Sequence, residues 1–143
     1  MNEIKRKVER YLRGQLRAAL PGQKFLTAKG GDDEEDGTPS DVSLSPPYAV
    51  IEATDAEKML ADEPTWMVEA SVTYVTHIGD ESAPAHSANV RAIYDTLEQL
   101  PRGFYPEQRL TVHGTDITGS DSVSDSERKS HGDVILLNVA VTG

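Results

Sequence analysis

Apolar residues near the start of the chain recur at intervals of three and four positions. Because an α-helix has 3.6 residues per turn, this spacing places them along one stripe of a helix over residues 3–20. Gly14 lies inside the pattern and costs up to about 1 kcal/mol relative to alanine, so packing is expected to hold the helix. Pro21 and Gly22 then end it. The stripe consists of Ile4, Val8, Tyr11, Leu12, Leu16, Ala19 and Leu20.

The segment 27–47 breaks this periodicity. It holds Gly30 and Gly31, five acidic residues over 32–36, and three prolines, with few apolar residues to bury. Such a composition predicts a long loop or arm, of the kind that an assembly protein orders against a neighbour. The acidic run offers oxygen ligands for a hard cation, but a solvated loop is the favoured interpretation because the carboxylates have no fixed spacing.

Two strands are predicted in the middle of the chain. The apolar run 48–53, bounded by prolines and Thr54, indicates the first strand, and residues 55–63 are expected to form a helical turn. Between Trp66 and Ile78 apolar and polar residues alternate, which is typical of a half-buried strand.

A second helix and two further strands complete the pattern. Pro84 suits the first turn of a helix whose apolar spacing extends to Leu100. Residues 109–113 alternate again and predict a third strand. The polar segment 119–132 predicts either a mobile loop or a wide hairpin connection. The last strand, 133–141, is apolar on both faces, as central strands are.

The predicted order of elements has no repeated strand–helix unit. It favours the α+β class, with about four strands in a mostly antiparallel sheet, an N-terminal helix and a second helix packed on one face, plus long loops. A chain of 143 residues is the size of one domain. We expect a basic amphipathic helix over 1–22, an acidic arm over 27–47 and a core of sheet and helix over 48–143.

Charge is distributed unevenly along the chain. Residues 1–29 contain eight Lys or Arg and two Asp or Glu, while the remainder contains six and 22. The net charge of −10 argues against binding DNA through its phosphates. Two portions of opposite sign favour association between copies, although a solvated basic helix face is the alternative. The expected interface cations are Arg10, Arg13 and Arg17, with Arg128 and Lys129 in the late polar segment.

Several classes of protein are disfavoured by what the sequence lacks. No run approaches the roughly 18 apolar residues of a membrane span, and the charged N-terminus does not look like a signal peptide, so we expect synthesis in the cytoplasm and no membrane partner. The absence of cysteine excludes disulfides, thiolate metal sites and cysteine nucleophiles.

The sequence also lacks the common catalytic motifs. There is no phosphate-binding glycine loop, no Gly-x-Ser-x-Gly turn and no His-Glu-x-x-His helix. The best candidate for a metal site is His77, Asp80, Glu81 and His86, which surround one predicted turn, although an exposed loop explains them equally simply. We therefore predict no catalytic, cofactor-binding or metal-binding residues and no cofactor.

The polar segment 119–132 offers a second candidate for catalysis. His113 and His131 flank it, and its many hydroxyl and carboxylate side chains could supply the other members of a Ser/His/Asp triad. Polar loops commonly hold the same residues, and nothing in the sequence specifies a nucleophile turn or an oxyanion hole. This pattern therefore does not predict a hydrolase.

The C-terminal part of the chain resembles the tail terminator and tail-completion proteins of long-tailed bacteriophages. The resemblance covers roughly residues 66–143: a helix that begins near a histidine and holds Val-Arg, a strand that ends in glycine, a variable polar segment with arginine, and a final apolar strand. The positions that match are His86, Val90, Arg91, Leu97, Val112, Gly114, Arg128, the run His131–Val134, and the residues on to Val141.

This resemblance implies a non-enzymatic virion protein at the junction of tail and neck. It would form a ring of six subunits that stops polymerisation of the tail tube and joins the tail to the head connector. Its partners would be copies of itself, the tail tube protein and the connector or neck protein, with DNA passing through the lumen without specific binding. The alternatives are a head–tail adaptor or stopper and, in another class, a small metal-dependent hydrolase using His77 and His86.

Overall fold

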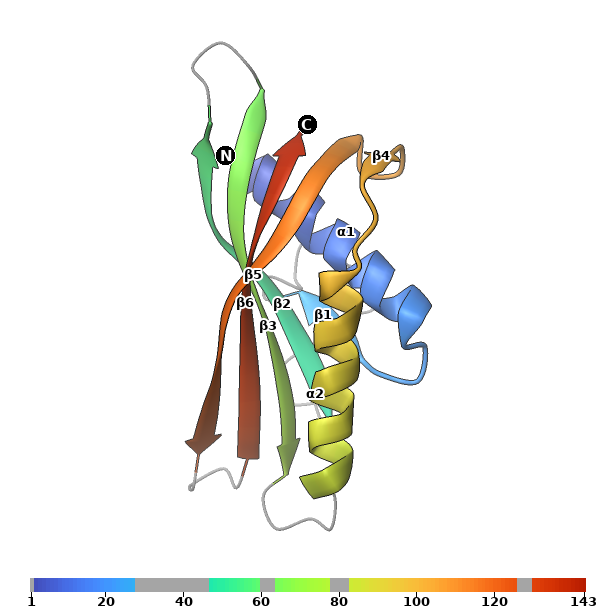
Figure 1. Cartoon of the computed structure of the whole chain (residues 1–143), viewed down its shortest axis with the longest axis vertical. Coiled ribbons are helices and arrows are strands. Elements are labelled where there is room, and N and C mark those ends of the chain that lie inside the picture. Colours follow the sequence, from blue (N-terminus) through green and yellow to red (C-terminus); the bar gives the residue numbers. More distant parts are fainter. Residues whose placement is uncertain (1, 28–46, 60–63, 78–82, 126–129) are drawn as a thin grey trace.

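The computed structural model describes residues 2–27, 47–59, 64–77, 83–125 and 130–143. Two helices and six strands are present in these ranges (Figure 1). In chain order they are α1 (Asn2–Ala19), β1 (Phe25–Thr27), β2 (Tyr48–Lys58), β3 (Thr65–His77), α2 (Ala83–Glu98), β4 (Gly103–Tyr105), β5 (Leu110–Asp125) and β6 (Ser130–Thr142).

The strands form one sheet in the order β1-β2-β3-β6-β5-β4. β1 runs parallel to β2, and every other neighbouring pair is antiparallel. The sheet is strongly twisted and curls into a half-barrel, with both helices on the same side (Figure 1). We call the side that carries the helices the inner face and the opposite side the outer face.

The apolar stripe predicted for α1 is buried against the inner face. Ile4, Val8, Leu12 and Leu16 are at most 6% exposed, which confirms the predicted helix and the orientation of most of the stripe; Ala19, near its end, is exposed. Gly14 lies on the exposed side. The main chain turns after Ala19, where Pro21 cannot continue the helical hydrogen bonding.

Helix α2 covers the adjoining part of the inner face. Ile93 and Leu97 are fully buried, and Val90 and Tyr94 pack against the same core. From the sheet, alternate residues of each strand complete that core, as the alternation predicted for β3 requires. The strand residues are Phe25, Ala49, Ile51, Ala53, Ala56, Val68, Ala70, Val72, Tyr74, Leu110, Val112, Ile135, Leu137, Val139 and Val141. No helix in the described ranges has the length and apolar character that crossing a membrane demands.

The prediction of a four-stranded, mostly antiparallel sheet is wrong, although the class remains α+β. The sheet is mixed and has two further strands, β1 and β4, one at each edge. Each has three residues, too few to show a period of two in the sequence. β1 pairs with β2 in parallel, which requires a longer connection than a hairpin turn, and residues 28–47 separate the two strands in the sequence.

Two segments predicted to be irregular continue as strand. The prediction of a helical turn over 55–63 is wrong for residues 55–58, because β2 continues through a bulge between Ala53 and Asp55 and pairs with β3 as far as Lys58. Similarly, most of 119–132 belongs to the paired strands β5 and β6, so the loop interpretation is wrong and the hairpin interpretation is nearer. Of the arm predicted over 27–47, residues 28–46 lie outside the described residues.

Candidate functional site

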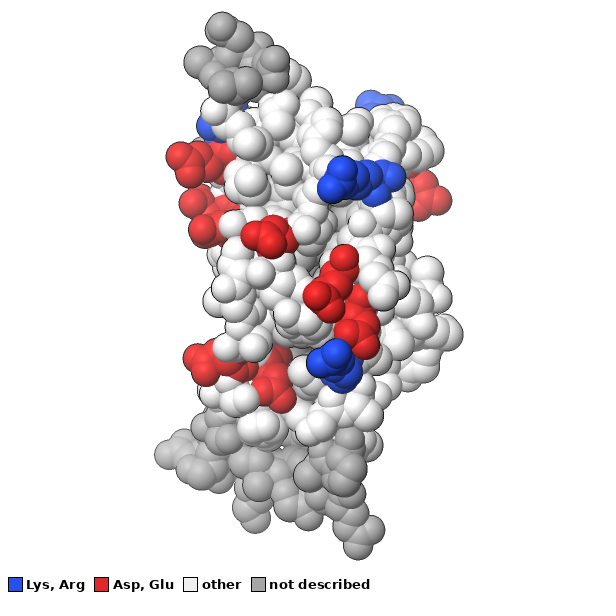
Figure 2. Space-filling view, in the orientation of Figure 1, with Lys and Arg blue, Asp and Glu red and all other residues white. Residues whose placement is uncertain are grey.

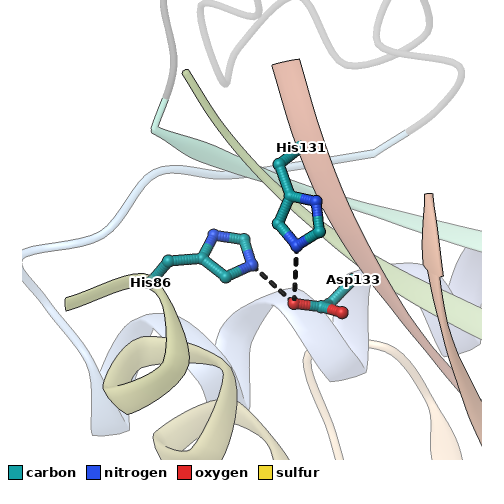
Figure 3. Close-up of side chains that lie close together, drawn as sticks. All are labelled: His86, His131 and Asp133. Carbon is teal, nitrogen blue, oxygen red and sulfur yellow. Dashed lines mark hydrogen bonds and ion pairs between the residues drawn. The ribbon is translucent and has the colours of Figure 1, made fainter. Parts of the chain in front are cut away.

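Three ionisable side chains gather on the inner face where α2 begins. His86 stands in the first turn of α2, while His131 and Asp133 lie two residues apart on β6 (Figure 3). Because side chains of a strand alternate between its faces, residues 131 and 133 project to the same side, toward α2. β6 is the central strand between β3 and β5, so the site rests on the most extensively paired part of the sheet.

The carboxylate of Asp133 lies between the two imidazoles. Its Oδ2 is 2.5 Å from Nε2 of His86 and 3.7 Å from Nε2 of His131 (Figure 3). The two rings are tilted by 54° with their centroids 4.8 Å apart. His86 is buried, whereas Asp133 and His131 are half-buried, so the site is open to solvent from one side.

Two hydroxyl groups hold the ends of this arrangement. Oγ1 of Thr76 on β3 lies 2.8 Å from Nδ1 of His86, and Thr76 is itself buried. On β5, the Ser122 hydroxyl donates a hydrogen bond to Oδ1 of Asp133. His86 and Asp133 are therefore each oriented by a second contact, one from each strand beside β6.

The electrostatics of the site favour an ionised Asp133. Burial alone would raise the pKa of its carboxyl group, but hydrogen bonds from Ser122 and His86 and the charges of His86 and His131 outweigh it and lower the pKa. Asp133 is therefore a carboxylate near neutral pH, able to bind a cation or a protonated imidazole.

The order of groups does not suit hydrolysis by a serine or threonine nucleophile. Ser122 contacts the carboxylate and not an imidazole, so no base is placed to take its proton. Thr76 does contact His86, but its hydroxyl group belongs to a buried strand residue where a substrate carbonyl has no access. The arrangement is better suited to holding a cation or fixing α2 on the sheet.

The candidate residues from the sequence are only partly brought together. His86 is in the site, but the side chain of His77 and residues Asp80 and Glu81 lie outside the described residues. His113 is exposed on β5, where its Nε2 is 2.7 Å from Oγ1 of Thr142. The metal cluster considered from the sequence is therefore not tested. Of the residues considered for a Ser/His/Asp arrangement, the structure brings Ser122 and His131 to Asp133 and leaves His113 apart.

The basic residues suggested as an interface occupy different environments. Arg13 is buried and Arg10 half-buried, while Arg17 is exposed and donates from Nη2 to the carbonyl oxygen of Phe25 at 3.1 Å. All three interact within the chain. Arg128 and Lys129 lie outside the described residues. A role of these cations at an interface remains a prediction.

Sequence reasoning missed the grouping of His86 with His131 and Asp133. Only part of the signal was present: the predicted strand begins at Asp133, and it would have to extend back to His131 for the spacing His131-x-Asp133 to place both side chains on one face. The missing information was that residues 119–132 pair as strand, and that α2 begins beside that part of β6. Long-range pairing of this kind is not encoded in a local pattern.

The outer face of the sheet exposes several large apolar side chains. Phe104, Val123 and Leu136 are 63%, 54% and 44% exposed. Leu136 alternates with the buried Ile135 and Leu137, and strand register puts Val123 and Phe104 on the same side of the sheet. Figure 2, in the orientation of Figure 1 and not facing the outer face, shows scattered acidic side chains, a few basic ones and wide uncharged areas.

Comparisons with known proteins identify the fold. No protein-family model matches the chain, and no curated protein matches its sequence. A solved structure described as the virion of a native gene transfer agent (GTA) particle contains a chain with a similar fold. The two chains superpose with a TM-score of 0.68 at 15% sequence identity, and the match covers 95% of each. The likeness shows that this chain shares that virion chain's fold over nearly its whole length.

Proposed function

We propose that the protein is a non-enzymatic structural component of a phage-like virion, and specifically a tail terminator. The observation that carries the proposal is the shared fold with a chain of a gene transfer agent virion, over 95% of both chains. At that coverage the match is not confined to a common small motif. The resemblance to tail-completion proteins over residues 66–143 also implies a virion protein.

The surface of the sheet supports an assembly role. Exposed Phe104, Val123 and Leu136 lie on the outer face, away from the helices. The strand register spreads them along the sheet, at the levels of residues 132, 136 and 142 of β6, so they are separate apolar side chains that a broad contact with another protein could cover. A ring needs two different complementary patches on each subunit, and the outer face supplies one of them.

The charge distribution is suited to the same role. A subunit with net charge −10 repels DNA, so a ring of such subunits would let DNA pass through its lumen without holding it. The excess of basic residues in 1–29 and of acidic residues elsewhere favours head-to-tail contacts between copies. A hexameric ring that caps the tail tube and contacts the head connector uses both properties.

The proposal is tested by the mass and binding of the purified chain. We expect a species that forms a closed ring, shows salt-dependent association, and is seen by electron microscopy at one end of isolated tail tubes from the same virion. Binding to the portal or connector with no affinity for tubes would overturn the terminator role and establish the adaptor alternative. A monomer that binds neither would contradict a virion role altogether.

A further inference from the structure

The cluster of His86, His131 and Asp133 has the composition of a metal site. Its ligand-capable atoms, two imidazole nitrogens and one carboxylate oxygen, all lie within 4.8 Å of one another. Two histidines and a carboxylate are a common ligand set for Zn²⁺, with a solvent molecule in the fourth position. The two elements that supply the ligands are a helix start and the central strand, both held by the core.

Two of the three separations between ligand atoms are close to those around a tetrahedral ion, while the widest, up to 4.8 Å, must shorten when an ion binds. Ligand bonds of about 2.0–2.2 Å place neighbouring ligand atoms about 3.3 Å apart in a tetrahedron. Nε2 of His131 and Oδ2 of Asp133, at 3.7 Å, already have that separation within a few tenths of an ångström. Nε2 of His86 and Oδ2 are 2.5 Å apart, a hydrogen-bond distance. A metal ion replaces the shared proton there, and the two atoms need to separate by less than about 1 Å.

The outer contacts are those that a metal site requires. A ligating histidine usually donates a hydrogen bond from its other ring nitrogen, which fixes the tautomer. Thr76 Oγ1 is placed to accept such a bond from Nδ1 of His86, which leaves Nε2 directed at Asp133. Likewise, Ser122 binds Oδ1 of Asp133 and leaves Oδ2 for an ion.

An ion can also reach the cluster. A cavity of about 550 Å³ opens between α2 and the β5–β6 pair, and Asp133 forms part of its wall together with Asp121 and Ser122. Two of the three ligand residues are half-buried. Solvent can therefore provide both an entry path and a fourth ligand.

We propose that His86, His131 and Asp133 bind a divalent transition metal ion of the Zn²⁺ class, which cross-links the start of α2 to β6. Bound metal would stabilise the folded state, because the unfolded chain does not bring the three ligands together. The inference does not depend on the virion role, since a cross-link of this kind would serve any use of the fold.

The experiment uses the full-length chain, freed of metal with a chelator and titrated with Co²⁺ as a spectroscopic probe. We expect one Co²⁺ per chain with the strong visible absorption of a tetrahedral ion, displacement by Zn²⁺, and a midpoint of thermal unfolding that rises with Zn²⁺ concentration. Mg²⁺ should produce neither effect, because it prefers six oxygen ligands.

Three variants locate the site. His131→Ala removes a ligand and should abolish the tetrahedral absorption. Ser122→Ala removes an outer contact from an exposed residue and should weaken binding roughly tenfold. His113→Ala is the matched control, a histidine elsewhere on the sheet, and should bind as the parent does. Absence of tetrahedral Co²⁺ binding by the parent chain, or equal binding by His131→Ala and His113→Ala, would overturn the proposal.

Discussion

A buried carboxylate of α1 accepts a hydrogen bond from the main chain of the sheet. Oε2 of Glu9 lies 2.8 Å from the backbone nitrogen of Ala53, and Glu9 is only 6% exposed. Ala53 immediately precedes the irregularity in β2, where the regular pairing with β3 shifts by one residue. The amide of Ala49 donates toward β1, and backbone groups alternate in direction along a strand, so the amide of Ala53 points to the same side, where β1 pairs with β2 only as far as Ile51. This donor therefore needs another acceptor. Glu9 supplies it and ties the helix to the bulge.

Replacing Glu9 by alanine should therefore destabilise the fold. The variant leaves the Ala53 amide buried without this acceptor, which costs about 1–3 kcal/mol of unfolding free energy. Glu9→Gln keeps a carbonyl oxygen at the same position and should lose less. Chemical denaturation of the three proteins measures the difference.

The matched control is Glu3→Ala, at an exposed glutamate on the same helix. Its 4.0 Å ion pair with Lys7 is a surface contact, so the change should stay within about 0.5 kcal/mol. Equal stability of Glu9→Ala and Glu3→Ala would contradict the importance of the bulge contact.

A second link of α1 to the rest of the fold predicts sensitivity to alkali. The hydroxyl groups of Tyr11 and Tyr105 both donate to the carbonyl oxygen of Pro101, at 3.0 and 2.8 Å. Burial, followed by the proximity of Tyr105, raises the pKa of Tyr11 above its ordinary value of 10.0.

The sign of the effect follows from the unfolded chain, in which Tyr11 ionises at its ordinary pKa. Above about pH 10 the unfolded state thus holds fewer protons than the folded state, and stability falls as pH rises. Below that pH the contribution is fully present. Tyr11→Phe cannot ionise, so its unfolding free energy should fall less steeply between pH 9 and about 11 than that of the parent. Parallel pH profiles for the two proteins would show that Tyr11 ionises freely in the folded state.

The outer face supplies a prediction about assembly. Leu136→Asp places a charge at a side chain that is 44% exposed, so the isolated subunit should remain folded with little change in stability. If the outer face is a subunit contact, the buried charge would weaken the ring by at least tenfold in association constant. Sedimentation or light scattering measures this. Ala88→Asp, an equivalent charge on the exposed side of α2, is the control that should assemble normally.

Elements whose pattern lies within a short stretch of sequence were predicted best. The stripe of α1 and the alternation of β3 have enough repeats to define their buried faces, and both are confirmed. By contrast, Ser and Asp in residues 119–125 suggested a loop, yet they form strand because β6 pairs with them throughout. The decisive hydrogen bonds come from a partner distant in the sequence, and propensity is a weak guide there.

The candidate site failed to emerge from the sequence for the same reason. His86 and Asp133 are separated by 47 residues, and their contact depends on where α2 crosses the sheet. From residue types alone, the possible site residues were the few histidines and the many carboxylates of the chain. The strand register was needed to show which of these side chains lie next to one another.

Two glycines give opposite predictions for the same substitution. Gly103 has φ of 137°, a conformation that side chains strongly disfavour, whereas Gly14 lies in the exposed part of helix α1. A Cβ at either position would meet no atom within 4 Å, so only backbone conformation distinguishes them. Gly103→Ala should destabilise the protein by about 1–3 kcal/mol, and Gly14→Ala should stabilise it by up to about 1 kcal/mol. Thermal or denaturant unfolding of both variants tests this pair. Destabilisation by Gly14→Ala would mean that this side of α1 is not solvent-exposed in the folded protein. Unchanged stability of Gly103→Ala would mean that the backbone at the start of β4 adopts another conformation at no cost in free energy.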